Sequence, residues 1–361
     1  MSGDHSIQIR YALQREDFAL DVDLELPMRG ITGVFGVSGA GKTSLLRCIA
    51  GLERPSSGKL VVAGEVWQDD SVNKWRAVHE RDVGYVFQEP RLFAHLDVRG
   101  NIEYGLRRRE QNGAPDIDHV IALLGLEELL SRMPEQLSGG EAQRVAIARA
   151  LLCVPRFVLM DEPLASLDQA RKAEILPFLD RLHAEADVPI IYVSHNIDEV
   201  CRLCDHLVVV DNGRVVADGD LQSVLVRMDV PLLDGEQAGS VIQGIVQAYD
   251  ENDDLTRLTF SGGELWVPGR ASADELPLRL RIRANDVSLC REKPEQSTIL
   301  NIVPAVIDAI QPDLGPSALV RLAIGKDRIV SRVTRRSIRE LDLNAGDEVF
   351  AQIKSVAVRR S

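Results

Sequence analysis

The sequence predicts an α/β domain followed by a smaller all-β domain. From residue 5 to about residue 228, short apolar runs typical of strands alternate with amphipathic helical stretches. Residues 229–239 contain Pro and Gly and end this pattern. The short alternating runs that follow are typical of a small barrel or sandwich. Because 361 residues are too many for one compact core, we expect domains at 1–228 and 240–361, joined by a linker.

Local patterns predict the individual strands and helices. In the first domain, the short apolar runs ITGVF, FVLMD and PIIYVSH predict buried parallel strands. Apolar residues have helical spacing in TSLLRCIAGL, AQRVAIARALL and RKAEILPFLDRLHAEA. In the second domain, the predicted strands are VIQGIVQAYD, LTRLTF, ELWVP, LRLRIR, PAVIDAIQ, ALVRLAI, RIVSRV and EVFAQIKSVAV.

Charge and hydropathy exclude several classes of function. The formal net charge is −13 at pH 7, which argues against a nucleic-acid partner, because such a partner needs a broad basic surface. No run of about 18 apolar residues predicts a membrane span. The first residues, MSGDHSIQIR, contain no signal-peptide core. We therefore expect the chain to remain in the cytosol and to reach a membrane only through partners.

The five cysteines are scattered along the chain and predict no disulfide framework. Cys201 and Cys204 form a CxxC pair inside the helical-looking stretch IDEVCRLCDHL. No second Cys or His pair follows at metal-ligand spacing. We therefore interpret this pair as ordinary helix packing, and not as a zinc or redox site.

A phosphate-binding loop is predicted at GVSGAGKT, Gly36 to Thr43, between the strand ITGVF and a helical stretch. Glycines allow backbone N–H groups to surround phosphates, and the start of the helix adds its dipole. Lys42 is expected to reach the β- and γ-phosphates, and the Thr43 hydroxyl to bind Mg²⁺. The alternative, a Gly-rich turn, does not require this strand–loop–helix context.

Two adjacent carboxylates follow the buried strand FVLMD. Asp161 stands at the end of that strand, where a carboxylate can hold the shell of Mg²⁺. Glu162 is next and is placed to polarise the attacking water or to accept its proton. Without the phosphate loop, a solvated strand end would be the preferred interpretation.

A second anion site is predicted at LSGGEAQRVAIARALL, Leu137 to Leu152. Ser138, Gly139 and Gly140 begin a helix, so their free N–H groups and the serine hydroxyl can bind a phosphate. A Gly-containing N-cap is the alternative interpretation of these residues. That alternative does not account for the ordered set of motifs around them.

These motifs resemble those of ABC transporter ATPases in content and in order. The set is GVSGAGKT, the Gln of YVFQEPRLF, LSGGEAQ, LMDEP, ASLD and IYVSH. It is similar to that family's Walker A, Q-loop, signature, Walker B, D-loop and H-loop, and it covers nearly all of residues 5–228. The resemblance implies a homodimer that binds two ATP molecules with Mg²⁺, each between one Walker A loop and the partner's signature motif.

The resemblance also implies roles for single residues. Gln88 would sense the γ-phosphate, Mg²⁺ and water, His195 would hydrogen-bond the γ-phosphate, and Asp168 would link the two ATP sites. An aromatic side chain that stacks on adenine is expected before Walker A, with Tyr11 and Phe18 as candidates. The implied catalytic residues are Lys42, Gln88, Glu162 and His195, the metal ligands are Thr43, Gln88 and Asp161, and the nucleotide contacts are Gly36, Val37, Ser38, Gly39, Ala40, Gly41, Lys42, Thr43, Ser44, Ser138, Gly139, Gly140 and Asp168.

A single ATPase cassette followed by a β-rich domain resembles the ATP-binding subunit of a bacterial binding-protein-dependent importer. Members that act in DNA maintenance or translation typically have a long coiled-coil insertion or two fused cassettes, and this chain shows neither. The stretches GVSGAGKTSLL, GYVFQEPRLFAHLDVRGNIEYG, DEPLASLD and RIRANDVSL resemble the molybdate importers. Tungstate is not distinguished from molybdate, and sulfate, ferric iron, polyamine and sugar importers are the alternatives.

The resemblance to importers implies specific partners. They are integral-membrane permease subunits and, through the complex, a periplasmic oxyanion-binding protein. The chain would then lie peripherally on the cytoplasmic face of the bacterial inner membrane.

The tail, STILN followed later by AQIKSVAV, resembles an OB-like molybdate-binding module at about residues 296–361. Hydroxyl, amide and cationic groups suit a tetrahedral dianion. The implied oxyanion ligands are Ser297, Thr298, Asn301, Lys354 and Ser355. In that family such a domain can bind the oxyanion and inhibit transport. The alternative is that STILN is a strand entry with polar ends and that Lys354 is simply solvated.

Overall fold

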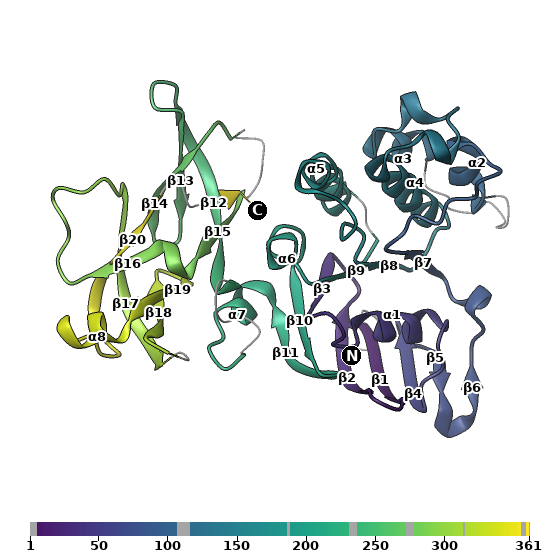
Figure 1. Cartoon of the computed structure of the whole chain (residues 1–361), viewed down its shortest axis with the longest axis horizontal. Helices are drawn as coiled ribbons and strands as arrows, with labels where there is room; N and C mark the ends of the chain where they lie inside the picture. The colour runs from purple at the N-terminus through teal and green to yellow at the C-terminus, as the bar shows by residue number, and fades with distance from the viewer. Residues whose placement is uncertain are drawn as a thin grey trace. The chain divides into compact units, whose positions relative to one another are not determined.

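The computed structural model describes residues 6–106, 116–185, 188–230, 237–271, 278–312, 315–354 and 359–360. Within the chain, two compact units divide between Asp218 and Gly219. Each unit contains its own sheets and its own hydrophobic core. The α/β and all-β fold class predicted from the sequence is confirmed (Figure 1).

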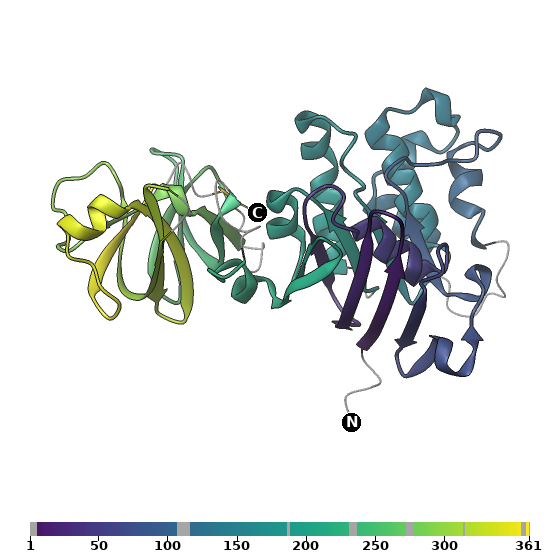
Figure 2. The ribbon, with the colours of Figure 1, turned by 60° about the horizontal axis from the view of Figure 1, so that its bottom comes forward.

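In the described residues, the first unit is built on a sheet of eleven strands. Figure 1 and Figure 2 show this sheet from two directions. The strands β3, β7, β8, β9 and β10 form its parallel part, and β1, β2, β4, β5 and β6 form an antiparallel part. Across the sheet the order is β6 (Lys74–Trp75), β5 (Glu65–Asp69), β4 (Ser57–Val62), β1 (Ser6–Gln14), β2 (Ala19–Pro27), β11 (Arg214–Asp220), β10 (His206–Asp211), β3 (Ile31–Phe35), β9 (Ile190–Ser194), β8 (Phe157–Asp161) and β7 (Val83–Val86).

Helices α1 (Lys42–Ala50) and α6 (Ile197–Leu203) pack on opposite faces of the parallel part, and α4 (Gly139–Leu151) packs on β7. Helices α2 (Val98–Glu103) and α3 (Ile117–Leu123) pack on α4, and α5 (Gln169–Glu185) packs on α4 and α6. Strand β3 shows the two faces: Val34 packs in the core that contains the apolar side of α1, whereas Gly33 faces Val200 and Cys204 of the α6 region. All residues of β3, β8 and β9 are therefore buried, as their apolar sequences predict.

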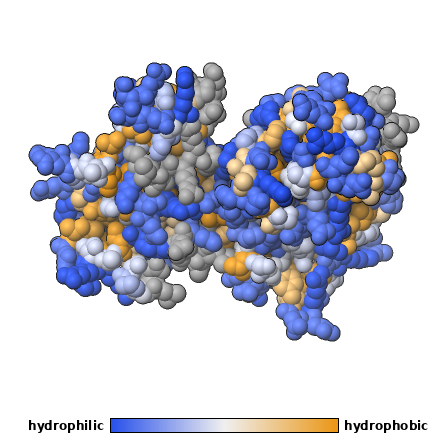
Figure 3. Space-filling view, turned by 45° about the horizontal axis from the view of Figure 1, so that its top comes forward, coloured by the Kyte–Doolittle hydropathy of each residue, from blue (hydrophilic) through white to orange (hydrophobic). Residues whose placement is uncertain are grey.

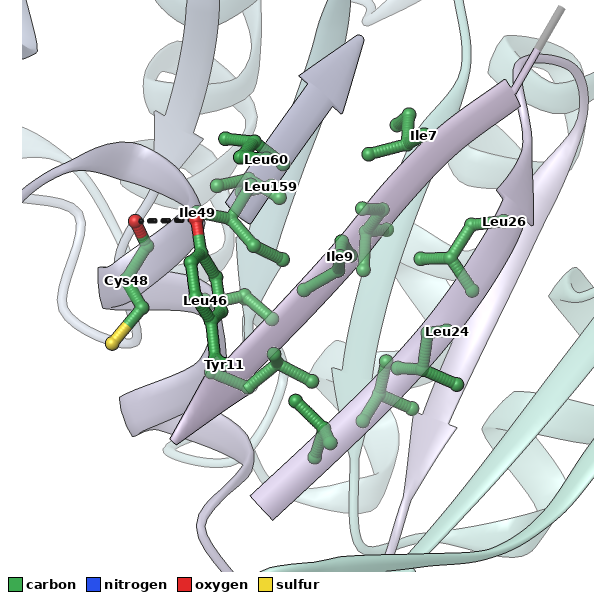
Figure 4. Packing of buried hydrophobic residues seen from close by; sticks show 14 of the residues in the cluster. Ile7, Ile9, Tyr11, Leu24, Leu26, Leu46, Cys48, Ile49, Leu60 and Leu159 are labelled. Carbon is green, nitrogen blue, oxygen red and sulfur yellow. Dashed lines mark hydrogen bonds between the residues drawn. The ribbon is translucent and has the colours of Figure 1, made fainter. Parts of the chain in front are cut away.

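Strands β1 and β2 follow a different pattern, because one face of this hairpin packs inward and the other is exposed. Along β2, buried residues alternate strictly with exposed ones up to its last residue. Figure 4 shows Ile7, Ile9, Leu24 and Leu26 directed into the same core as α1. The sequence analysis did not single out this antiparallel part of the sheet.

Among its described residues, the second unit contains two five-stranded antiparallel sheets. One has the order β14 (Gly263–Pro268), β13 (Leu255–Phe260), β12 (Gly239–Asp250), β15 (Leu278–Arg283) and β21 (Arg359–Arg360). The other has the order β16 (Val287–Cys290), β20 (Glu348–Ile353), β17 (Asn301–Pro312), β18 (Ser317–Ile324) and β19 (Asp327–Thr334). Apolar residues from both sheets form one core, and the short helix α8 (Arg335–Glu340) follows β19.

The division between the units lies before residue 228, where the sequence predicts the end of the first domain. Helix α7 (Leu221–Leu225) packs on β12 of the second unit. Val226 and Met228 pack with Ala238, Ala284 and other residues in a small cluster of that unit. The segment around α7 therefore contributes apolar side chains to the β-rich unit. Part of the predicted linker, residues 231–236, lies outside the described residues.

Hydrophilic residues dominate the face shown in Figure 3, with smaller hydrophobic areas between them. Across the described parts of the chain, no helix combines the length and the apolar character needed to cross a membrane.

Candidate functional site

The predicted phosphate loop connects β3 to the first turn of α1. Gly39 and Gly41 have φ angles of +83° and +100°, a region that residues with a Cβ rarely adopt. A Cβ on Gly41 would also lie 2.4 Å from Cζ of Phe18. Glycine at position 41 thus permits both the turn into α1 and the close approach of the β1–β2 hairpin.

Lys42 is buried, and its ammonium group lies within this loop. Its Nζ donates hydrogen bonds of 2.9 Å to the carbonyl oxygens of Gly36 and Val37. The same Nζ lies 3.4 Å from Oε1 of Glu162. The structure thus brings the predicted Lys42 and Glu162 together, although 120 positions of sequence separate them.

Asp161 lies at the end of β8 and accepts two hydrogen bonds. The Thr43 hydroxyl donates to its Oδ1 at 2.9 Å, and the Tyr85 hydroxyl donates to its Oδ2 at 3.1 Å. Burial raises the pKa of Asp161, while the hydrogen bonds from Thr43 and Tyr85 oppose that shift. The hydroxyl of Thr43 and the carboxylate of Asp161 form a hard oxygen donor pair, which fits Mg²⁺.

Tyr85 is a site residue that the sequence analysis missed. It lies on β7, which pairs in parallel with β8, and its Cα partner there is Leu159. A signal was available, since Tyr85 belongs to the short apolar run that precedes Gln88. Only the pairing of β7 with β8 brings its hydroxyl to Asp161.

Glu162 has a φ angle of +46°, which is uncommon for a residue other than glycine. Its N–H donates to the carbonyl oxygen of Val193 on the neighbouring β9 at 3.1 Å. His195 Nδ1 lies 2.8 Å from Oε2 of Glu162. Such a backbone conformation costs about 1–3 kcal/mol and is concentrated at functional sites. With this backbone conformation, the Glu162 carboxylate is directed toward both Lys42 and His195.

Eight of the predicted residues of the ATP site, together with the adenine candidate Phe18, line one cavity of about 370 Å³. Arg15 also lines it and pairs with Glu53, and the sequence analysis did not single out Arg15. The cavity is lined by Arg15, Phe18, Ser38, Gly39, Gly41, Lys42, Thr43, Ser44, Gln88 and Glu162. Its size and its many polar groups suit a phosphorylated ligand.

The two aromatic candidates for adenine stacking lie in different environments. Phe18 lines the cavity beside the phosphate loop. Tyr11 is 1% exposed and packs among core residues, and its hydroxyl donates to the carbonyl oxygen of Cys48 at 3.3 Å (Figure 4). Because β1 alternates between core and solvent, position 11 falls on the core side. Tyr11 was therefore a wrong candidate, and Phe18 remains.

The predicted second anion site lies at the start of α4, where Ser138 is the N-cap. Ser138 Oγ accepts from the N–H of Glu141 at 3.3 Å, and the Ser138 N–H donates to the Glu141 carboxylate at 2.7 Å. This capping box is the local structure that the alternative interpretation anticipates. None of Ser138, Gly139 and Gly140 lines the cavity around Lys42 in the same chain.

Asp168 lies just before α5 and is exposed. Its carboxylate accepts a hydrogen bond of 2.9 Å from the N–H of Arg171, so it caps the start of that helix. Asp168 does not line the cavity of its own chain either. Its predicted role at a second ATP site stays a prediction.

The predicted oxyanion residues in the second unit gather at one end of its second sheet. In the antiparallel pairing of β17 with β20, Asn301 lies opposite Ile353. Leu300, which precedes Asn301, and Lys354, which follows Ile353, therefore lie at the same end of the sheet. Ser297, Thr298 and Lys354 are exposed. Ser297 Oγ accepts a hydrogen bond of 3.0 Å from the N–H of Ile299. Ser355 lies outside the described residues.

Asn301 differs from this group because its side chain is buried and is directed to the other sheet. Its Oδ1 accepts from the N–H of Trp266 at 2.7 Å, and its Nδ2 donates to the carbonyl oxygen of Trp266 at 3.0 Å. The amide therefore pairs with the edge strand β14 as another strand would. This contact gives Asn301 a structural function, while its role as an oxyanion ligand stays a prediction.

Cys201 and Cys204 are both buried at the end of α6. Cys204 Sγ lies 2.8 Å from the position of a Cβ on Gly33, so this end of the helix packs closely on β3. Within the described ranges, no group of three or more His, Cys, Asp or Glu side chains is arranged to hold a metal ion.

Known proteins resemble this chain over both units. The ABC transporter family matches residues 19–165, and the TOBE domain matches residues 297–359. A solved structure of cbiO1 from Clostridium perfringens, described as part of the ABC transporter complex cbiONQ, is similar with a TM-score of 0.53 and 25% identity. That similarity covers 62% of this chain and 92% of the other.

Curated relatives match nearly end to end. The molybdenum import ATP-binding protein ModC of Methylococcus capsulatus is 50% identical over 353 residues, which are 98% of this chain and 99% of the relative. The protein of the same name from Thiobacillus denitrificans is 51% identical over 359 residues, covering 99% of each chain. This chain therefore belongs to the ModC family of ABC transporter ATP-binding proteins.

Proposed function

We propose that this chain is the ATP-hydrolysing subunit of a bacterial molybdate importer. The observation that carries the ATPase is the convergence of Lys42, Asp161, Glu162 and His195, from three separate segments, beside one polar cavity. The molybdate cargo is supported by end-to-end similarity to proteins named for molybdenum import. Membership of this family also argues against the alternative roles in DNA maintenance or translation.

Each residue has a part in the proposed reaction. Lys42 and the N–H groups of the phosphate loop bind the phosphates of ATP. Thr43 and Asp161, with Gln88, would hold Mg²⁺, which when bound supplies positive charge against the phosphate oxygens. Glu162 accepts the proton of the attacking water.

His195 orients the Glu162 carboxylate, because its Nδ1 lies within hydrogen-bond distance of Oε2. We assign the other ring nitrogen, Nε2, to the γ-phosphate. Phe18, which lines the cavity beside the phosphate loop, is assigned to stack on adenine.

Substitution of Glu162 tests this proposal. The variant Glu162→Gln should bind ATP with nearly wild-type affinity, while steady-state phosphate release falls by about 10²- to 10⁴-fold, because the proton acceptor is lost. Nucleotide binding and phosphate release are measured on the full chain together with its membrane subunits. Glu25→Gln, an exposed residue of β2, is the matched control. Hydrolysis by Glu162→Gln at the wild-type rate would contradict the assignment of Glu162 as the proton acceptor.

We infer that two copies of the chain form the complete ATPase. The Ser138–Gly140 segment begins a helix but does not line the cavity of its own chain, which leaves it available to the nucleotide bound by a second copy. Asp168, also outside that cavity, would link the two sites. The dimer would lie on the cytoplasmic face of the inner membrane beneath two permease subunits, which receive the oxyanion from a periplasmic binding protein.

We also propose that the second unit binds the transported oxyanion and inhibits transport. Ser297, Thr298 and Lys354 are exposed at one end of the second sheet, where hydroxyl groups and a cation suit a dianion. The match of residues 297–359 to the TOBE domain agrees with this location.

Calorimetric titration of the full chain with molybdate, tungstate and sulfate tests the oxyanion site. Molybdate and tungstate should both bind, because their size and charge are nearly equal. Lys354→Met should weaken that binding, since one charge-assisted contact is lost. Absence of heat with all three anions would remove the sensor and leave the ATPase assignment unchanged.

A further inference from the structure

A buried carboxylate outside the ATP cavity connects two of the segments that form the site. Glu199 of α6 is 5% exposed. Its Oε2 accepts hydrogen bonds from the Tyr192 hydroxyl at 3.0 Å and the Ser194 hydroxyl at 2.8 Å. Its Oε1 accepts from Nζ of Lys172 at 2.8 Å. A carboxylate is costly to bury, and these three donors compensate for that cost.

The first connection runs from Glu199 to His195. Ser194 is the last residue of β9, and its hydroxyl donates to Glu199 while accepting from the N–H of Asn196 at 3.0 Å. The residues before and after His195 are therefore fixed by one hydroxyl group. His195 Nδ1 in turn lies 2.8 Å from the Glu162 carboxylate. The position of the imidazole ring thus depends on the hydrogen bond between Ser194 and Glu199.

The second connection runs from Glu199 to the start of α5. Lys172 lies in the first turn of that helix, and its N–H donates to the carbonyl oxygen of Asp168 at 2.9 Å. The ion pair between Lys172 and Glu199 is shielded from water, with exposed side-chain fractions of 14% and 6%. The same carboxylate therefore also holds the helix turn that follows Asp168.

We propose that Glu199 is a positioning residue for ATP hydrolysis. It holds His195 toward Glu162 and links the segment 194–196 to the start of α5. This inference depends on the proposed ATPase function. Glu199 does not line the nucleotide cavity, and it acts on the site through its contacts with Ser194 and Lys172. A glutamine at position 199 does not reproduce the arrangement, because its single amide oxygen can accept either from the Lys172 ammonium or from the two hydroxyl groups, and its NH₂ group offers no acceptor to the other side.

The structure supplies a matched control between the same two helices. Arg202 of α6 donates from Nε to both carboxylate oxygens of Asp180 on α5, at 3.0 and 3.2 Å. Asp180 lies about two helical turns beyond Lys172. Loss of this ion pair changes the packing of α5 on α6 without touching Ser194.

The experiment compares Glu199→Gln, Ser194→Ala and Asp180→Asn in the full chain together with its membrane subunits. Glu199→Gln and Ser194→Ala should lower kcat on the order of 10- to 100-fold, because His195 is misplaced. The KM for ATP should change by less than about twofold, since the phosphate loop is intact. Asp180→Asn should lower the melting temperature and leave kcat near the wild-type value.

A double-mutant cycle that combines Glu199→Gln with His195→Ala separates a positioning role from general destabilisation. If Glu199 acts through His195, Glu199→Gln should slow the His195→Ala variant by less than about twofold. Independent, multiplied losses in the double variant would overturn the proposal, as would wild-type kcat in both Glu199→Gln and Ser194→Ala. A wild-type complex without ATPase activity would instead refute the proposed function itself.

Discussion

At the scale of single residues, Tyr11 and Phe18 show why a side chain's environment matters more than its type. Both are aromatic, and both precede the phosphate loop. Tyr11 is enclosed in the core, where burial raises the pKa of its hydroxyl far above the ordinary value. Phe18 lies over Gly41 at the edge of the cavity. The difference arises because position 11 is on a strand face and position 18 is in a hairpin turn.

Replacement of these two residues should have opposite consequences. Phe18→Ala should raise the KM for ATP about 3- to 10-fold, the effect of losing an aromatic stacking contact of about 0.5–1.5 kcal/mol. Tyr11→Phe, the control, should leave KM unchanged and reduce stability by about 1 kcal/mol, because one buried hydrogen bond is lost. ATPase titrations and thermal unfolding measure the two effects. An unchanged KM in Phe18→Ala would exclude Phe18 as the adenine platform.

At the scale of elements, helix α1 shows how one helix is fixed at both ends. Its first turn carries Lys42 and Thr43 of the phosphate loop. At the other end, Arg81 donates from one guanidinium nitrogen to the carbonyl oxygens of Cys48 and Ile49 at 2.9 and 2.6 Å. A buried cation at this end also complements the helix dipole. Arg81 is thus a C-terminal cap supplied by a distant segment.

Removal of this cap should destabilise the first unit. Arg81→Met should lower its stability by about 2–3 kcal/mol, because two buried carbonyl oxygens lose a charged donor. Urea unfolding followed by circular dichroism measures the change. Arg54→Met is the control, since Arg54 stacks over the same Trp75 ring as Arg81 but its side chain is 58% exposed. Equal losses in the two variants would contradict the capping role.

At the scale of the whole molecule, the two units have separate hydrophobic cores. The cavity around Lys42 is lined by residues of the first unit only. A ligand that binds one folded unit stabilises that unit by mass action. ATP is therefore expected to stabilise the first unit selectively.

Differential scanning calorimetry of Glu162→Gln, which should not consume ATP, tests this expectation. At 100 times its Kd, ATP should add about 2.7 kcal/mol to the stability of the first unit and raise one of two unfolding transitions. The other transition should move with molybdate if the oxyanion proposal is correct. If the chain instead shows one unfolding transition, and ATP shifts that entire transition, the two units unfold together.

The sequence by itself determined the features that depend on contiguous residues. The phosphate loop, the carboxylates after FVLMD and the order of the motifs can all be read along the chain. Strand and helix periodicity was sufficient for the α/β and all-β fold class. These features are local, because the spacing of neighbouring residues and the strand–loop–helix sequence decide them.

The tertiary structure alone decided which distant residues meet. Pairing of β7 with β8 brings Tyr85 to Asp161, and the packing of β17 near β14 directs Asn301 to Trp266. The buried contacts of Glu199 likewise join α5, α6 and β9. No local pattern encodes these contacts, because they depend on sheet order and register, which the packing of the whole unit fixes.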